Sequence, residues 1–418
     1  MSNIPELRFK EFSGEWDTKP YGEIYKFYST NSLSREKLNY QSGEVYNIHY
    51  GDIHTKFSTM FKLENENVPF INSDVDLSKI KEENYCQVGD LVIADASEDY
   101  ADIGKTIEII SLNDKKTLAG LHTFLARPNK EYVALGFVGY MLQNYTVRKQ
   151  IMKIAQGTKV LSLSTGRLSN IILNLPQKQE QQKIASFLTT IDTKIEQLTK
   201  KVELQEQYKK GVMQKIFSGE IRFKKDDGSE FDEWEEKRLG DFLIERNIQI
   251  PKSVSYPLMA FVANQGVTPK NERYNREFLV NDEKNKKYKK TEFGDFIYSS
   301  NNLETGSIGL NNYGSATISP VYSIFEISKS CNYQFIGSLL TRKDFINKMI
   351  KWRQGVVYGQ WRIHESDFLK IKISLPSLPE QNKIANFLST LDKQIDSSKE
   401  QLAKTKEFKK GLLQRMFV

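Results

Sequence analysis

Cysteine, histidine and long apolar runs are scarce in this sequence of 418 residues. The two cysteines, Cys86 and Cys331, lie far apart without metal-ligand spacing, so we expect a reducing compartment, the cytoplasm, and small buried side chains. The four histidines also lack ligand spacing, and we predict no bound metal. No apolar run reaches the length of a membrane helix, and the N-terminus lacks the pattern of a secretory signal. The sequence therefore predicts no membrane partner.

Motifs for catalysis are missing as well. No Asn-Pro-Pro-aromatic or Asp-Pro-Pro-aromatic tetrapeptide occurs, although an amino-methyltransferase needs one. Residues 104–106 (Gly-Lys-Thr) imitate the end of a phosphate-binding loop, but Asp99 stands where its first glycine belongs. His364 is followed at the fourth position by Phe368, whereas a zinc helix needs a second histidine there. We predict no catalytic residue and no cofactor in this chain.

What the sequence does contain is enough apolar material for real cores. Hydrophobic residues make up 39% and charged residues 27%, which excludes a disordered or fibrous protein. The length predicts two to three domains. The net charge of +7 is compatible with a polyanionic partner but does not demonstrate one.

The strongest signal is an internal repeat. Residues 174–217 align with residues 374–417 without a gap, at an offset of 200. Weaker matches precede them, since Gly-Asp at 89–90 recurs at 294–295 and Gln-Gly at 156–157 recurs at 354–355. The chain is therefore two copies of one unit, a globular domain followed by a long helix. The identical pairs of the helical segments include Leu175/Leu375, Pro176/Pro376, Glu180/Glu380, Gln181/Gln381, Lys183/Lys383, Asp192/Asp392, Lys209/Lys409 and Phe217/Phe417.

Both helical segments carry a narrow apolar stripe. Its steps alternate between four and three residues, which is the 3.5-residue period of a coiled-coil seam. Gln205 and Lys209 interrupt the first stripe, and Ser398 and Thr405 weaken the second. Because the second helix starts where the second domain ends, we expect it to run antiparallel to the first. The predicted seam consists of Ile184, Leu188, Ile191, Ile195, Leu198, Val202, Ile384, Leu388, Leu391, Ile395, Leu402 and Leu412.

The globular units show short strand-like runs at 91–94, 106–110 and 318–327, and helical spacing at 133–154 and 335–350. This mixture predicts an α+β fold, with two domains joined by two long antiparallel helices in a nearly circular pseudo-two-fold repeat. The predicted boundaries are domain 1 at 1–173, helix 1 at 174–217, domain 2 at 218–373 and helix 2 at 374–418.

The doubled pattern Leu-Pro, Glu-Gln, Lys-Ile-Ala, Phe-Leu, followed by Lys-Lys-Gly, resembles the specificity subunit of type I restriction–modification systems. The resemblance covers essentially the whole chain. It implies two target-recognition domains without catalytic activity of their own. It also implies double-stranded DNA as a ligand and two kinds of protein partner, methyltransferase subunits, two of them expected, and restriction/translocase subunits. The partners are expected to use S-adenosylmethionine, ATP and Mg²⁺.

Base edges are recognised by hydrogen-bond donors and acceptors, while Lys and Arg on phosphates set the register. Side chains suited to these tasks gather in the predicted loops. We selected as DNA-binding candidates Asn47, His49, His54, Lys56, Lys105, Gln156, Lys159 and Arg167 in domain 1, and Asn264, Gln265, Lys270, Asn301, Asn302, Arg353, Gln354, Gln360 and Arg362 in domain 2.

Two other interpretations stay open at this point. One is a coiled-coil scaffold without DNA specificity. The other is a stand-alone DNA-modifying enzyme with a fused target domain, against which the missing cofactor motifs argue.

Overall fold

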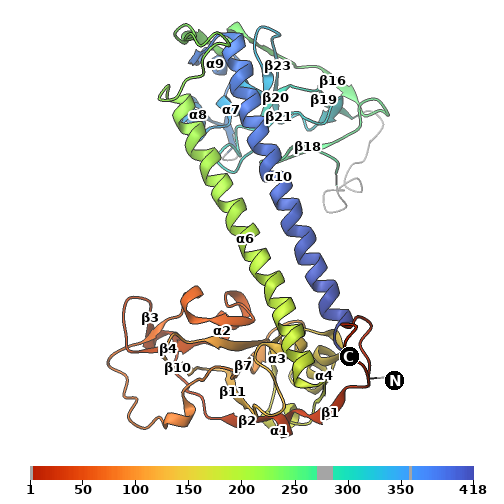
Figure 1. Ribbon diagram of the computed structural model, residues 1–418. Helices are drawn as coiled ribbons and strands as arrows, with labels where there is room; N and C mark the ends of the chain where they lie inside the picture. Colours follow the sequence, from red (N-terminus) through yellow and green to blue (C-terminus); the bar gives the residue numbers. More distant parts are fainter. Residues whose placement is uncertain (1–2, 271–285, 357–359) are drawn as a thin grey trace. The chain divides into compact units, whose positions relative to one another are not determined.

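The computed structural model describes residues 3–270, 286–356 and 360–418. The chain divides into two compact units, Met1–Lys201 with Ser398–Val418, and Val202–Ser397. Each unit contains one α+β domain and one part of each long helix, as the colours of Figure 1 show. The predicted fold class, two recognition-type domains joined by two long helices, is confirmed.

The first unit is built around a five-stranded sheet with the strand order β2-β11-β7-β9-β5. It also contains a four-stranded sheet with the order β10-β4-β6-β3. A two-stranded pair of β1 and β13 closes the domain. Its elements are β1 Asp17–Pro20, α1 Tyr21–Ile24, β2 Tyr25–Tyr28, β3 Leu38–Asn39, β4 Val45–Ile48, α2 Tyr50–Thr55, β5 Met60–Lys62, β6 Phe70–Ile71, β7 Leu91–Ala94, β8 Ala96–Ser97, β9 Thr106–Ser111, β10 Lys116–Ala119, β11 Thr123–Pro128, α3 Phe137–Met141, α4 Tyr145–Ile154, β12 Leu161–Ser162, α5 Thr165–Leu168, β13 Ile172–Leu175 and α6 Lys178–Phe217.

The second unit repeats this plan with a four-stranded sheet in the order β15-β23-β20-β21, and β14 paired with β26 closes the domain. Its elements are β14 Glu235–Arg238, β15 Leu243–Glu245, β16 Gln249–Pro251, β17 Ala260–Val262, β18 Gly266–Thr268, β19 Lys287–Thr291, β20 Phe296–Tyr298, β21 Ile308–Leu310, β22 Ala316–Ile318, β23 Ser323–Ile327, α7 Tyr333–Leu340, α8 Lys343–Ile350, β24 Gln354–Val356, β25 Gln360–Arg362, α9 Glu365–Phe368, β26 Lys372–Leu375 and α10 Leu378–Arg415.

Each central sheet has a buried aspartate at the start of its middle strand. The glycine before Asp90 has a φ of +96° and the glycine before Asp295 a φ of +85°, which glycine adopts without steric cost. Arg127 donates two hydrogen bonds to Asp90, and Arg246 donates two to Asp295. Burial raises the pKa of both carboxyls, and the arginines oppose that shift. The Gly-Asp turns that recur in the sequence therefore serve the fold of each sheet.

The two sheets differ in one buried charge. Glu108 lies opposite Leu91 in the first sheet, where Leu310 lies opposite Phe296 in the second. The Glu108 carboxylate accepts hydrogen bonds from two backbone N–H groups at the start of α3, at 2.6 and 2.7 Å. Burial raises the pKa of Glu108 to about 7, although these N–H donors lower it in part. The repeat therefore preserves the fold while it exchanges a leucine for a helix-capping carboxylate.

The repeated Glu-Gln pair attaches each long helix to its domain. Buried Glu180 accepts two hydrogen bonds from Arg8, at 2.8 and 2.7 Å, and buried Glu380 accepts two from Arg222, at 3.3 and 2.9 Å.

The glutamines act in the same repeated way. Gln181 donates to the carbonyl oxygen of Pro176, and its own carbonyl oxygen accepts from the backbone of Ala134. Gln381 donates to the carbonyl oxygen of Pro376 and accepts from the backbone of Asn332. Identical residues at the repeat offset therefore make identical contacts.

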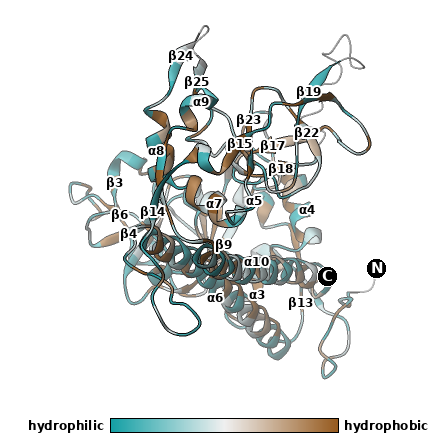
Figure 2. Ribbon diagram, turned by 90° about the horizontal axis from the view of Figure 1, so that it is seen from above, coloured by the Kyte–Doolittle hydropathy of each residue, from teal (hydrophilic) through white to brown (hydrophobic). Residues whose placement is uncertain are grey.

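The predicted seam residues are all buried or half-buried. Within the first unit, Asp192 of α6 pairs with Lys409 of α10 at 2.6 Å, and Ile184, earlier in α6, packs in the same cluster as Met416, just after α10. The two helical parts therefore run in opposite directions. Within the second unit, Lys209 pairs with Asp392. The interruption at Lys209 is thus an interhelical ion pair. Figure 2 shows that hydrophilic residues cover most of both helices.

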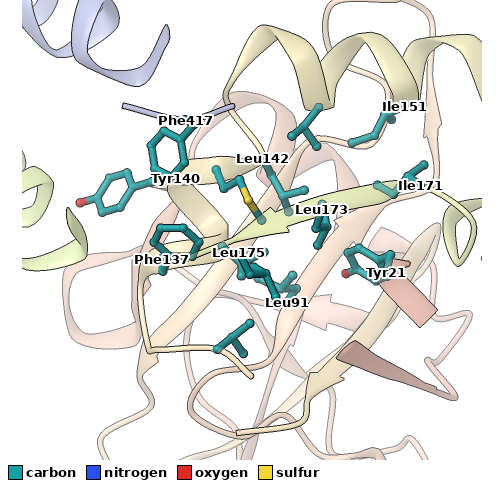
Figure 3. Packing of buried hydrophobic residues seen from close by; sticks show 14 of the residues in the cluster. Tyr21, Leu91, Phe137, Tyr140, Leu142, Ile151, Ile171, Leu173, Leu175 and Phe417 are labelled. Carbon is teal, nitrogen blue, oxygen red and sulfur yellow. The ribbon is translucent and has the colours of Figure 1, made fainter. Parts of the chain in front are cut away.

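The core of the first unit joins elements from both ends of the chain. Phe137 packs against Phe417, with ring centroids 5.4 Å apart, and Leu173 and Tyr21 are buried in the same cluster (Figure 3). Trp16 is buried against these rings, and Trp234 packs on Phe335 in the second unit. Both tryptophans therefore pack against the aromatic rings of their own unit.

The two chain termini lie in the same unit, as Figure 1 shows. The backbone N–H of Leu7 donates to the carbonyl oxygen of Arg415, whose side chain pairs with Glu6 at 2.8 Å. In the second unit the corresponding contacts join Lys215 to residues 220–221, which lie shortly after it in the same stretch of chain. The near-circular repeat is therefore visible in the contacts themselves.

Some boundaries differ from prediction. Helices α6 and α10 begin at Lys178 and Leu378, four residues after the predicted 174 and 374, because residues 172–175 and 372–375 are strands that pair with β1 and β14. The run 318–327 is two strands rather than one, interrupted by Pro320. Within the described residues, no helix has the length and apolar character needed to span a bilayer.

Candidate nucleic-acid interface

The same end of each domain gathers loops from distant parts of the chain. In the first unit, the backbone of Leu163 donates to the carbonyl oxygen of Asp95, just after β7, and β12 pairs with β8. In the second unit, the backbone of Ile363 donates to the side chain of Ser300, just after β20. We call this region the loop end of a domain, comprising residues 47–56, 95–105, 119–123 and 156–167 in the first unit and residues 262–270, 299–307, 352–356 and 360–365 in the second.

Several domain 1 candidates meet at this loop end. The Lys105 ammonium donates to the backbone carbonyl of His54 at 2.6 Å, and His54 Nε2 lies 2.9 Å from the carbonyl oxygen of Ala96. Gln156, Lys159 and Arg167 are exposed. The structure thus brings Lys105 and His54 together and leaves Gln156, Lys159 and Arg167 exposed. The contact of these residues with DNA stays a prediction.

Lys56 belongs to an ion-pair cluster instead of standing alone. It lies 2.9 Å from buried Asp52, which also accepts two hydrogen bonds from Arg35. Burial raises the pKa of Asp52, but the two cations outweigh it, and the pKa falls below its usual value. The cluster fixes the start of α2 and leaves Arg35 and Lys56 partly exposed.

Asn47 and His49 are buried, and this corrects the expectation that they line a surface. Asn47 accepts a hydrogen bond from Asn31 at 2.7 Å, and His49 Nδ1 accepts the backbone N–H of Gly51 as the cap of α2. Burial lowers the pKa of His49, and Arg35 adds to the shift. Both side chains lie inside the domain at the end of strand β4, and their hydrogen bonds hold the neighbouring loops in place.

The domain 2 candidates also converge. Asn301 accepts the backbone N–H of Trp361 at 2.6 Å, and the backbone of Asn264 donates to Gly306. Exposed Gln354 and Arg362 are partners in the β24–β25 pair. Asn302, Gln265 and Lys270 are exposed in the same loops, and the side chain of Gln360 lies outside the described residues.

Arg353 is engaged within the protein. Its guanidinium donates two hydrogen bonds to Glu304, at 2.6 and 2.7 Å, and its side chain is only 8% exposed. Arg362 lies 3.7 Å from Glu365 and stays largely exposed. Of these two arginines, Arg362 is the one the structure leaves accessible to a phosphate or a base edge.

The structure adds Tyr50, Asp95 and His122 to the loop end, which the sequence did not single out. Asp95 Oδ1 lies 3.3 Å from His122 Nδ1, and the ring of His122 lies 5.2 Å from that of Tyr50. These residues come from three separate segments, so no spacing rule could have joined them. No group of three or more His, Cys, Asp or Glu suited to a metal ion occurs in the described part of the chain.

Comparison with known proteins identifies the family to which this chain belongs. The family model for the type I restriction modification DNA specificity domain matches residues 15–206 and again residues 232–407. The chain belongs to this family. The two matches fall on the two repeats, as the sequence predicted, and they make the protein a DNA specificity subunit rather than a catalytic one. Neither the scaffold without DNA specificity nor the stand-alone modifying enzyme is supported.

Relatives agree with this assignment. The putative type I restriction enzyme MjaX specificity subunit of Methanocaldococcus jannaschii is 26% identical over 378 residues, which are 80% of this chain and 82% of the relative. The MjaVIII specificity subunit of the same organism is 26% identical over 64% of this chain and 67% of its own. The crystal structure of the S subunit from M. genitalium shares the fold, with a TM-score of 0.58 at 16% identity, over 99% of each chain.

Proposed function

We propose that this specificity subunit binds a bipartite, asymmetric DNA target, with one half-site contacted by the loop end of each domain. The observation that supports it is a contrast within the repeat. The helix anchors Glu180 and Glu380 make the same contacts in both units, whereas the loop ends place different side chains at matching positions. Two loop ends with different side chains on one repeated scaffold are suited to bind two different half-sites.

Sequencing of modified bases tests this proposal directly. The chain is co-expressed with its methyltransferase subunit, and methylated positions are mapped in host DNA. We expect one motif made of two unlike half-sites separated by an unspecified spacer. A single continuous motif, or methylation without sequence preference, would contradict the bipartite reading.

We further propose that the subunit holds two methyltransferase subunits, one on each repeat, and that restriction/translocase subunits join this assembly. Tyr208 and Phe408 support two equivalent docking sites, because they lie at the repeat offset and are 58% and 56% exposed. Each is followed by Lys-Lys-Gly, and an added Cβ on Gly211 or Gly411 would meet no neighbour. An exposed aromatic ring beside a bare helix turn permits close approach of a partner.

Replacing Tyr208 or Phe408 with alanine is expected to release one methyltransferase subunit from the complex. An aromatic anchor in a protein interface is worth about 2 kcal/mol or more, which is about 30-fold in affinity. Native mass spectrometry of the assembled complex would show the lost subunit. Leu204→Ala is the matched control, since Leu204 is 52% exposed on the same helix but its repeat counterpart is Lys404. Full occupancy in both aromatic variants would refute these docking sites.

The chain itself is proposed to need no cofactor. S-adenosylmethionine, ATP and Mg²⁺ would be bound by the partner subunits. Since its ligand is genomic DNA, we place the protein in the cytoplasm.

A further inference from the structure

Three of the chain's four histidines surround one tyrosine. The ring of Tyr50 lies 4.7 Å from that of His49, 6.0 Å from that of His54 and 5.2 Å from that of His122. His49 is buried, His54 is half-buried, and the side chain of His122 is 51% exposed. We call these four residues the Tyr50 cluster. It presents one imidazole, that of His122, to the outside.

The backbone of His122 is held in an unusual conformation. Its φ is +54°, in the left-handed region that costs an ordinary residue about 1–2 kcal/mol. Its carbonyl oxygen accepts the backbone N–H of Asp95 at 3.1 Å, which ties the turn after β10 to the end of β7. A strained residue kept in place by its surroundings is typical of a functional position. The backbone of His122 is therefore held in place by the neighbouring strand end.

The side chain of Asp95 favours one form of the His122 ring. Asp95 Oδ1 is buried, makes no hydrogen bond in the described part of the chain, and lies 3.3 Å from His122 Nδ1. A carboxylate attracts a proton and repels a lone pair, so this proximity favours the neutral tautomer with its proton on Nδ1. Nε2 then keeps its lone pair, and the described residues offer it no donor.

Two buried polar atoms, one in the Tyr50 cluster and one in strand β4 before it, are left unsatisfied. Neither His54 Nδ1 nor Asn47 Nδ2 has a hydrogen-bond partner among the described residues. Unpaired buried polar atoms cost free energy, so their retention beneath an exposed imidazole is not explained by stability. The neighbouring Lys105 supplies positive charge at the same loop end. The imidazole of His122 could accept a hydrogen bond from a base edge while Lys105 contacts a phosphate nearby.

We propose that His122 Nε2 contacts a base of the domain 1 half-site and accepts a hydrogen bond from the exocyclic amino group of adenine or cytosine in the major groove. Asp95 is the positioning residue whose charge favours this tautomer, and Tyr50 packs against the ring. These two amino groups are the donors that base pairs present in the major groove. The inference rests on the proposed function, since it assigns a contact within one of the two half-sites.

His122→Gly tests the contact, because glycine removes the ring and adopts the positive φ without strain. The complete complex is assembled with each variant, and binding is measured by competition between duplexes that differ at one base pair of the mapped target. We expect discrimination at one position of the domain 1 half-site to fall about 10-fold, the value of one hydrogen bond. The half-site of domain 2 should stay unchanged.

Asn113→Gly is the matched control. Asn113 has a φ of +50° in the turn between β9 and β10, so the same relief of backbone strain occurs away from the Tyr50 cluster. It should alter neither half-site. If His122→Gly discriminates between base pairs as well as the unchanged protein does at every position of the target, the inference is wrong, although the bipartite target stands. A target that proves not to be bipartite instead overturns the proposed function.

Two further measurements separate contact from support. The first measurement uses a duplex whose target adenine or cytosine lacks its amino group. The unchanged protein should bind this duplex about 10-fold more weakly than the normal duplex, whereas His122→Gly should bind both duplexes equally well. Asp95→Asn should change preference rather than merely weaken binding, because an amide can accept from or donate to Nδ1 and frees the tautomer. Additive losses in the first measurement, or an unchanged preference at that position in the second, would overturn the assignment.

Discussion

Exchange of the second recognition domain for that of another specificity subunit is expected to replace one half of the DNA target and keep the other. All domain 2 candidates lie between β14 and β26, and none is supplied by α6 or α10. Each mismatched base pair costs about 1–3 kcal/mol, so two mismatches in the old half-site should weaken binding by at least about 30-fold.

The position of the junctions decides whether this exchange folds. Strand β14 pairs with β26 through Glu235 opposite Leu375, so a cut inside either strand would split the pair. The exchanged segment should therefore run from before Trp234, which packs on Phe335, to the Leu375–Pro376 bond. Methylation mapping of the hybrid complex gives the new motif. A change in both halves, or in neither, would show that the domains do not act separately.

Removal of Glu180 or Glu380 is expected to cause the largest loss of stability of any single substitution considered for this chain. Each carboxylate is buried and accepts two hydrogen bonds from an arginine, Arg8 or Arg222. Truncation to alanine removes the buried carboxylate of the pair, which costs about 3–5 kcal/mol when a buried pair is broken. Arg222 keeps its ion pair with Glu233, and Arg8 keeps its hydrogen bonds to backbone carbonyl oxygens. The cost should lie near the low end, because both arginine side chains keep some solvent contact.

Chemical denaturation followed by circular dichroism measures this effect in each variant. Lys183→Ala is the control, since its pair with Glu11 joins two half-exposed side chains and should contribute less than about 1 kcal/mol. A joint replacement of Arg8 and Glu180 by leucine and methionine should recover much of the lost stability. If Glu180→Ala unfolds at the same denaturant concentration as the control, the pair does not anchor α6.

Repetition made the scaffold predictable. A residue that recurs at a fixed offset must serve a need common to both units, and Gln181 and Gln381 do so through identical contacts with Pro176 and Pro376. The apolar stripe likewise predicted the buried face of both helices, because a 3.5-residue period has one geometric meaning. The helix anchors and the apolar stripe are thus repeated in both the sequence and the structure.

The loop ends were predictable only in outline. Composition pointed to Asn47 and His49, but burial depends on which strands enclose a residue, and β4 lies inside the sheet β10-β4-β6-β3. The partner of the buried aspartate shows the same limit. Arg127 comes from β11 in the first unit, whereas Arg246 follows β15 in the second. Contacts across strands carry no signature along the chain when different strands supply them.

The contact between Leu7 and Arg415 has a consequence for how the chain can be connected. It reproduces, between two distant segments, a link that is continuous chain between Lys215 and residues 220–221. We therefore expect a circularly permuted chain, opened within residues 218–222 and joined by a linker near Leu7 and Arg415, to fold into the same two units. The order of the two recognition domains along the chain would then be reversed without a change in the contacts that hold each domain to its helices.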